Sequence, residues 1–95
     1  MLFALICRDK PGRLQLRQDT RPQHLDFLSG LGDQLKLAGP FLDPDGKPNG
    51  TLAIIEAVDL AGAQAIAATD PYAKAGLFEE VTIRPWVWAV RNPEA

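Results

Sequence analysis

The stretch Arg21-Pro22-Gln23-His24-Leu25-Asp26-Phe27-Leu28, which continues to Leu37, holds the only histidine among the 95 residues and predicts the helix around which the chain is arranged. Pro22 suits the first helical position, where its missing N–H would have no partner, so we expect the helix to span residues 21–37. Three leucines follow His24 at offsets of four, seven and eleven residues, a spacing that places them on the same helical face as His24: Leu28, Leu31 and Leu35. The imidazole, in the first turn, is therefore predicted to project from the edge of an apolar face.

The composition is that of a globular chain. Hydrophobic residues make up 46% and charged residues 23%, which argues against disorder, and the length predicts a single domain over residues 1–95. Ten Lys and Arg against twelve Asp and Glu form no basic stripe, so we expect no nucleic acid partner. The apolar run at residues 1–7 is too short for the core of a signal peptide, and no run approaches the roughly 20 residues that span a bilayer. We expect a cytoplasmic protein without membrane contact.

Cysteine and histidine are too few for a disulfide or a zinc centre. Cys7 and His24 are each the only residue of their type, so neither an internal disulfide nor a Cys/His zinc cluster can form. A calcium loop of the EF-hand type that begins at Asp43 would need glycine and glutamate where the chain has Pro48 and Ile54. We therefore expect no metal and no cofactor, and we interpret Cys7 as an inert core residue.

Four predicted strands and two further helical segments accompany the helix at 21–37. Residues 2–8 are an apolar run bounded by Asp9 and Pro11, which is typical of a buried strand, and the polar segment that follows to Thr20 is predicted to be a loop. The remaining predicted elements are an edge or bulged strand at 37–42, a strand at 51–57, an alanine-rich helix at 60–68, a short helical turn from Asp70 to about Gly76, and a strand at 79–90.

The order β-α-β-β-α-β predicts a ferredoxin-like α+β fold, with a four-stranded antiparallel sheet and two helices on one of its faces. The opposite face should be polar if water covers it. The predicted strands at 2–8, 51–57 and 79–90 are instead apolar or aromatic on both faces, which indicates that a further surface covers the second side. A second copy of the same sheet would do so, and we expect a homodimer through the sheet face.

Six short motifs follow one another along nearly the whole chain: Arg21-Pro22-Gln23-His24-Leu25, Ala38-Gly39-Pro40, Asn49-Gly50-Thr51, Asp70-Pro71-Tyr72, Gly76-Leu77-Phe78 and Ile83-Arg84-Pro85-Trp86. In this combination the chain resembles the YciI-like, or YCII-related, family, which is similar to the dimeric α+β barrel superfamily that includes muconolactone isomerase. The resemblance implies a ferredoxin-like dimer with a histidine-aspartate pair in a cleft, matched here by His24 and Asp70. One relative is a dehydrochlorinase of a chlorinated hydroxyhydroquinone, while most members have no assigned substrate. The family often has serine where this chain has Thr51, which keeps the hydroxyl group.

The pair His24 and Asp70 has a catalytic and a structural interpretation. A carboxylate that accepts the imidazole N–H fixes the tautomer and leaves the other nitrogen to take or give a proton. Alternatively, His24 is a hydrogen-bonded core histidine and Asp70 is a helix cap before Pro71. A cap can also orient a histidine, so the two interpretations of Asp70 are compatible.

Arginine, hydroxyl and aromatic side chains are candidates to bind a substrate. An anionic substrate could be held by arginines at four positions, although surface arginines are common: Arg8, Arg13, Arg17 and Arg21. Thr51 offers its hydroxyl group. Tyr72 and Trp86 could form the walls of an aromatic site, while core packing or a dimer interface would explain them equally well.

Together these residues predict a cofactor-independent acid-base enzyme. We expect a lyase, isomerase or dehydrochlorinase that acts on a small aromatic or lactone-like acid, with His24 and Asp70 as catalytic residues. The substrate would be bound by Arg8, Arg21, Thr51, Tyr72 and Trp86. The alternative is a non-catalytic module of the same fold that binds or senses a small molecule in the same pocket.

Overall fold

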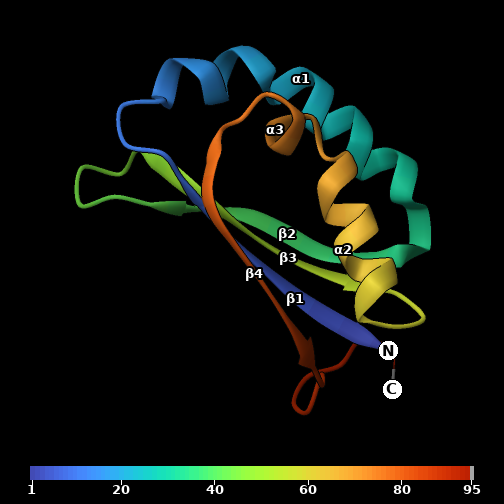
Figure 1. Cartoon of the computed structure of the whole chain (residues 1–95). Coiled ribbons are helices and arrows are strands. Elements are labelled where there is room, and N and C mark those ends of the chain that lie inside the picture. Colours follow the sequence, from blue (N-terminus) through green and yellow to red (C-terminus); the bar gives the residue numbers. More distant parts are fainter. Residues whose placement is uncertain (95) are drawn as a thin grey trace.

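A computed structural model describes residues 1–94 as one antiparallel sheet with helices on one side. The elements are β1 (Leu2–Asp9), α1 (Leu14–Leu31), the 3-10 turn η1 (Gly32–Gln34), β2 (Leu35–Leu42), β3 (Pro48–Glu56), α2 (Leu60–Thr69), α3 (Pro71–Lys74) and β4 (Phe78–Trp86). The strand order is β2-β3-β1-β4, and every neighbouring pair is antiparallel. The helices cover a single face of the sheet (Figure 1). This is the ferredoxin-like α+β fold that the sequence predicts.

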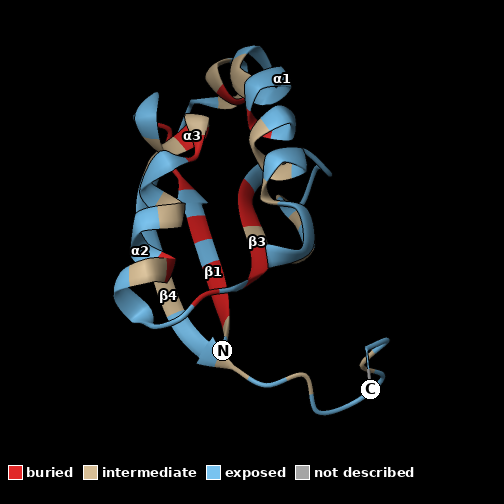
Figure 2. Cartoon of the chain, turned by 90° about the vertical axis from the view of Figure 1, so that its right-hand side faces the viewer, coloured by how far each residue is buried: buried red, intermediate tan, exposed pale blue. Residues whose placement is uncertain are grey.

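The position of each strand in the sheet follows from its prolines and apolar residues. Pro40 and Pro85 lie in β2 and β4, the two edge strands, where the missing N–H interrupts no ladder on the outer side. The edge position expected for Gly39-Pro40 is therefore confirmed. β1 and β3 occupy the centre and contain most of the buried residues of the sheet (Figure 2).

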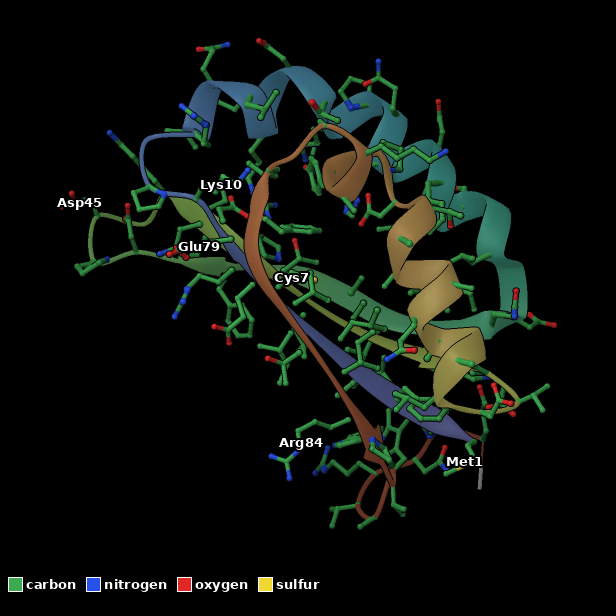
Figure 3. All side chains as sticks on the ribbon, viewed as in Figure 1. Met1, Cys7, Lys10, Asp45, Glu79 and Arg84 are labelled. Atoms are coloured by element: carbon green, nitrogen blue, oxygen red, sulfur yellow. The ribbon has the colours of Figure 1, made fainter. Side chains whose placement is uncertain are left out.

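The hydrophobic core lies between the sheet and the helices. Alternate residues of β1 and β3 point toward the helices and pack with α2 in one cluster: Phe3, Leu5, Cys7, Ala53, Ile55, Ala57 and Ala63. Thr51 is the cross-strand neighbour of Cys7, so it shares this face near the end of the strand pair. Figure 3 shows Cys7 pointing into the space below the helices, whereas Arg84 points away from them. The sheet thus directs a few polar groups toward α1.

The bounds predicted for the first helix are wrong at both ends. α1 begins at Leu14, so residues 14–20 of the predicted loop are helical, and Pro22 lies inside the helix. Pro22 is exposed, so the carbonyl group that loses its helical donor faces solvent, where water can replace the donor. The helix ends at Leu31 because Gly32 takes a φ of 56°, a left-handed conformation that favours glycine. His24 therefore lies near the middle of α1 and not in its first turn.

The last strand is shorter than predicted. β4 ends at Trp86, whereas the alternating pattern predicted a strand to Val90. The cross-strand partner of Trp86 is Leu2, the first residue of β1, so no β1 residue remains to pair with the segment beyond Trp86. The bounds of the other strands and of α2 lie within three residues of those predicted.

The sheet face opposite the helices is uncovered in the single chain and carries an apolar surface over β1, β2 and β3, while Arg8, Glu80 and Arg84 lie toward β4 on the same face. Ile6 is 39% exposed, Leu37 38% and Phe41 42%. Ile6 pairs across β1 and β3 with Leu52, and Leu37 pairs across β2 and β3 with Ile54, so these residues form one continuous surface. We call this surface the open sheet face. Within residues 1–94, no helix is both long and apolar enough to cross a membrane.

Candidate active site

Two cavities meet at His24, in the space between α1 and the sheet. The larger, which we call the outer cavity, has a volume of about 190 Å³, and its polar lining comes from Arg17, Gln18, Arg21, His24, Thr51 and Tyr72. A cavity of about 150 Å³ is enough for a benzene ring, so the outer cavity has room for a small aromatic molecule. The smaller, inner cavity has a volume of about 30 Å³, room for one or two water molecules. His24 and Thr51 line both cavities.

His24 and Asp70 form a buried hydrogen-bonded pair, with only 6% and 8% of their surfaces exposed. The distance from His24 Nδ1 to Asp70 Oδ1 is 2.9 Å. The same carboxylate oxygen accepts the backbone N–H of Tyr72 at 2.9 Å, so Asp70 is the N-cap of α3, with Pro71 in the first helical position. Asp70 thus caps a helix and also orients the histidine.

The pair leaves the second nitrogen of the imidazole free. A carboxylate can only accept, so Nδ1 carries a proton, and in the neutral imidazole Nε2 is then an acceptor. Within residues 1–94, Nε2 forms no hydrogen bond with a side chain or backbone group. Every fully buried side-chain nitrogen in this part of the chain does have a hydrogen-bond partner. Solvent therefore reaches Nε2, as expected for an atom at the wall of a cavity. The geometry presents a proton acceptor to a bound molecule.

Tyr72 connects the histidine to a buried arginine. Its ring lies on that of His24, with centroids 4.0 Å apart and planes inclined by 19°. The Cζ atom of Arg17 lies 4.6 Å from the centroid of the same ring, a cation–π contact. Burial raises the pKa of Tyr72, while the charges of Arg17 and Arg21 oppose that shift. The Tyr72 hydroxyl is therefore neutral at physiological pH.

Arg17 is held by a buried ion pair. Its Nε and Nη2 atoms donate to the two carboxylate oxygens of Asp9 at 2.7 and 3.0 Å, and Nη2 also donates to Thr51 Oγ1 at 2.7 Å. The two side chains of the pair are only 6% and 5% exposed. A bidentate contact of this kind fixes the plane of a guanidinium group. Arg17 therefore places a positive charge and a fixed set of donors beside the outer cavity.

Cys7 lines the inner cavity but lacks the chemistry of a nucleophile. Burial, with a smaller effect of the Asp70 charge, raises its pKa from 9.0 to about 12. The thiolate is the reactive form of cysteine, so this thiol is inert near neutral pH. Among residues 1–94, no three His, Cys, Asp or Glu side chains lie close enough together to hold a metal ion.

The structure brings together five of the seven residues that the sequence offers as site residues. Four of them line the outer cavity and Asp70 bonds His24 from the inner cavity: His24, Arg21, Thr51, Tyr72 and Asp70. Arg8 alternates with Cys7 and lies on the opposite face, where it pairs with Glu79 and Glu80. Trp86 lies at the Leu2 end of the sheet, with its ring 5.6 Å from that of Trp88. Neither Arg8 nor Trp86 reaches the cavities.

Asp9 and the anchoring role of Arg17 were missed by the sequence reasoning. The signal for Arg17 is its offset of seven residues before His24, which places both side chains on one helical face once the helix begins at Leu14. Asp9 is the polar last residue of β1 and, like Cys7, points toward the helices. Because the helix was predicted to begin at residue 21, the face that Arg17 shares with His24 and the contact of Arg17 with Asp9 were not predicted.

Comparison with known proteins places the chain in a family. The family model of the YCII-related domain matches residues 1–87. The chain belongs to the YCII-related family. Among relatives of this YCII-related protein, Protein YciI of Escherichia coli is 36% identical over 94 residues, covering 90% of this chain and 96% of YciI. An uncharacterized protein of Haemophilus influenzae is 31% identical with the same coverage.

Solved structures support the same relationship for the YCII-related chain. The 5-chloro-2-hydroxyhydroquinone dehydrochlorinase TftG of Burkholderia phenoliruptrix, solved in complex with 2,5-dihydroxybenzoquinone, has a TM-score of 0.84 and 33% identity. The match covers 92% of this chain and 94% of TftG. A NIPSNAP family protein of Agrobacterium tumefaciens has a TM-score of 0.57 at 17% identity, which shows a shared fold alone.

Proposed function

We propose that this YCII-related protein is a cofactor-independent acid-base enzyme of the lyase, isomerase or dehydrochlorinase type, in which His24 moves the proton. The observation that carries the proposal is the hydrogen bond from His24 Nδ1 to Asp70, together with Nε2 at the wall of the outer cavity. The carboxylate holds the tautomer and stabilises the imidazolium that forms when Nε2 takes a proton. A general base in this position typically contributes 10²–10⁴-fold to a rate.

The proposed substrate is a small, planar and oxygenated acid. The outer cavity is close to the size of one aromatic ring, and Arg17 and Arg21 supply positive charge at its wall. The dehydrochlorinase at 33% identity acts on a chlorinated hydroxyhydroquinone and was solved with a dihydroxybenzoquinone, which supports a ligand of this shape. In a dehydrochlorination, His24 would remove the proton, the electron pair of the broken bond to hydrogen would form a new π bond, and the electron pair of the C–Cl bond would leave with chloride.

We also propose that the protein is a homodimer joined through the open sheet face. The exposed side chains of Ile6, Leu37 and Phe41 form an apolar surface on the sheet. Burying this surface against a second copy removes it from water. The cavities lie on the opposite side of the sheet, so the proposed dimer leaves them open.

Turnover of 5-chloro-2-hydroxyhydroquinone, followed by chloride release, tests the enzymatic proposal. We expect chloride release by the wild type above a protein-free control, and a loss of roughly 10²–10⁴-fold in kcat for His24→Ala and for Asp70→Asn. Lys47→Ala is the control, because Lys47 is exposed in the turn between β2 and β3 and lines neither cavity, and it should stay close to the wild type. Thermal melting of each variant checks that the fold survives.

Two results would contradict the proposal. Saturable binding of a panel of hydroxylated and chlorinated aromatics without any product would favour the non-catalytic binding module. A His24→Ala variant that unfolds would favour a structural role for the histidine.

A further inference from the structure

We propose that Thr51 and Arg17 form a pair of hydrogen-bond donors for an oxyanion in the outer cavity, so that the substrate carries a carbonyl or phenol oxygen conjugated with the group that His24 deprotonates. The inference rests on the proposed acid-base function and narrows its substrate class. It assigns direct contacts with the oxyanion to the Thr51 hydroxyl and to Arg17, and Arg17 also positions that hydroxyl.

The Thr51 hydroxyl is a donor whose proton has no acceptor among the residues that the structure describes. Its oxygen accepts the N–H of Arg17 Nη2 at 2.7 Å, and a guanidinium nitrogen cannot accept in return. Within residues 1–94, no hydrogen bond uses the hydroxyl proton of Thr51. Thr51 is buried and lines the outer cavity, so a molecule in that cavity is the acceptor available to it. The contact with Arg17 also polarises the hydroxyl toward donation.

Arg17 is fixed and has one terminal nitrogen left for a ligand. Asp9 engages Nε and Nη2, and Tyr72 lies against the guanidinium. In the described part of the chain Nη1 makes no hydrogen bond. Every fully buried side-chain nitrogen there does make one, so Nη1 must be reached by solvent. Donors fixed in advance stabilise a developing negative charge without reorganising during the reaction.

The donors and the acceptor of the cavity match one kind of reaction. His24, Thr51 and Arg17 all line the outer cavity, where Nε2 can accept a proton and Thr51 and Arg17 can donate hydrogen bonds. When a proton leaves a C–H or O–H bond of a conjugated ring for Nε2, the electron pair of that bond moves onto the conjugated oxygen. That oxygen becomes a phenolate or enolate oxygen. Hydrogen bonds from the Thr51 hydroxyl and from the charged Arg17 would stabilise its negative charge.

Binding of 4-nitrophenol tests the donor pair without requiring turnover. At a pH below the pKa of free 4-nitrophenol, binding to the donors should increase the visible absorption band of the phenolate. Thr51→Val keeps the branched shape and removes the hydroxyl, and we expect it to bind the phenolate about 10- to 100-fold more weakly, as for loss of a hydrogen bond to a charged group. Thr51→Ser restores the hydroxyl and should bind within about threefold of the wild type.

A matched control and a second ligand complete the experiment. Thr82→Val removes a threonine hydroxyl from β4 outside both cavities and should leave binding unchanged. The wild type alone offers a test that holds even if Thr51→Val fails to fold. 4-nitrothiophenolate is also an anion, but its sulfur is a weak acceptor, so it should bind at least about tenfold more weakly than 4-nitrophenolate.

The outcomes separate this inference from the proposed function. A wild type that shows no preference for the phenolate, equal binding by Thr51→Val, or equal binding of the thiophenolate would overturn the donor pair. Phenolate binding that depends on the Thr51 hydroxyl, in a protein that releases no chloride from 5-chloro-2-hydroxyhydroquinone, would support the donor pair and contradict the dehydrochlorinase reaction.

Discussion

The rings of His24 and Tyr72 stack with their centroids 4.0 Å apart, and the backbone N–H of Tyr72 bonds the same Asp70 oxygen that accepts from His24. α3 is only four residues long, yet its N-cap Asp70 supplies the carboxylate, and its own Tyr72 supplies the aromatic ring, that fix two sides of the imidazole. The same ring contacts Arg17. The geometry of the site therefore depends on how firmly α3 is anchored. Tyr72, which is only 1% exposed, anchors α3 in the interior of the protein.

Removing the ring of Tyr72 should destabilise the protein and loosen the histidine. Tyr72→Ala empties a fully buried aromatic site, and we expect the free energy of unfolding to fall by roughly 3–5 kcal/mol. Tyr72→Phe keeps the ring and its stacking, and should change the free energy of unfolding by less than about 1 kcal/mol. Urea unfolding of both variants measures the difference. A Tyr72→Ala protein as stable as Tyr72→Phe would show that the stack is not part of the core.

The buried pair of Asp9 and Arg17 should behave differently when one partner or both are removed. Arg17→Met leaves the Asp9 carboxylate buried without its cation, and we expect a loss of roughly 3–5 kcal/mol in the free energy of unfolding. The double variant Asp9→Leu/Arg17→Met removes both charges and should be more stable than the sum of the two single losses predicts. Denaturant unfolding of the four proteins in this cycle measures the coupling.

An exposed ion pair provides the control for that cycle. Arg8 and Glu80 form a contact of 3.2 Å on the protein surface, and Arg8→Ala should cost no more than about 1 kcal/mol. If Arg17→Met costs as little as Arg8→Ala, Arg17 is not an anchored residue.

The buried thiol of Cys7 should make stability depend on pH in the alkaline range. Its pKa is raised from 9.0 to about 12 in the folded protein. Below pH 9.0 both states keep the proton, whereas between pH 9.0 and about 12 the unfolded chain loses a proton that the folded chain retains. The free energy of unfolding should therefore fall as the pH rises through this window. Tyr72, whose pKa is also raised from 10.0, should add to the fall at higher pH.

Cys7→Ala isolates the contribution of the thiol. Urea unfolding across this pH window should show a shallower fall for Cys7→Ala than for the wild type, while the contribution of Tyr72 remains. Iodoacetamide should modify Cys7 slowly in the native protein and rapidly in urea. Fast native modification, or equal pH slopes for the two proteins, would contradict a buried, protonated thiol.

The sequence predicted the topology because each apolar run is bounded by turn residues, and Pro40 showed which strand lies at an edge. The first residue of α1 was harder to predict from the sequence. Pro22 is typical of a helix start, but an exposed proline is tolerated inside a helix where water can replace the lost donor. From the sequence, Arg17 is predicted to be a surface residue, because arginine is seldom fully buried unless it is paired. Only the contact with Asp9 offsets the free-energy cost of burying its charge.

The same limit applies to Arg8 and Trp86. Alternation along a strand separates Arg8 from Cys7, but it does not say which face the helices cover when both faces are apolar. The packing of the helices decides that question, and it leaves Arg8 and Trp86 outside the site. His24 and Asp70 were predicted as a pair because the resemblance to the YCII-related family implies one, and Asp70-Pro71 is in addition a helix-capping signal that the sequence shows directly.

Dimerisation through the open sheet face is the last prediction. Ile6 lies on a central strand beside Leu52, and its side chain is partly exposed, so Ile6→Lys should fold while placing a charge in the middle of the proposed interface. Sedimentation equilibrium at micromolar concentration should give about twice the 10.4 kDa chain mass for the wild type and the chain mass for Ile6→Lys. Val58→Lys is the matched control, because Val58 is 90% exposed and lies between β3 and α2, outside the sheet. It should remain dimeric. A monomeric wild type, or a dimer that Ile6→Lys leaves intact, would exclude this face as the interface.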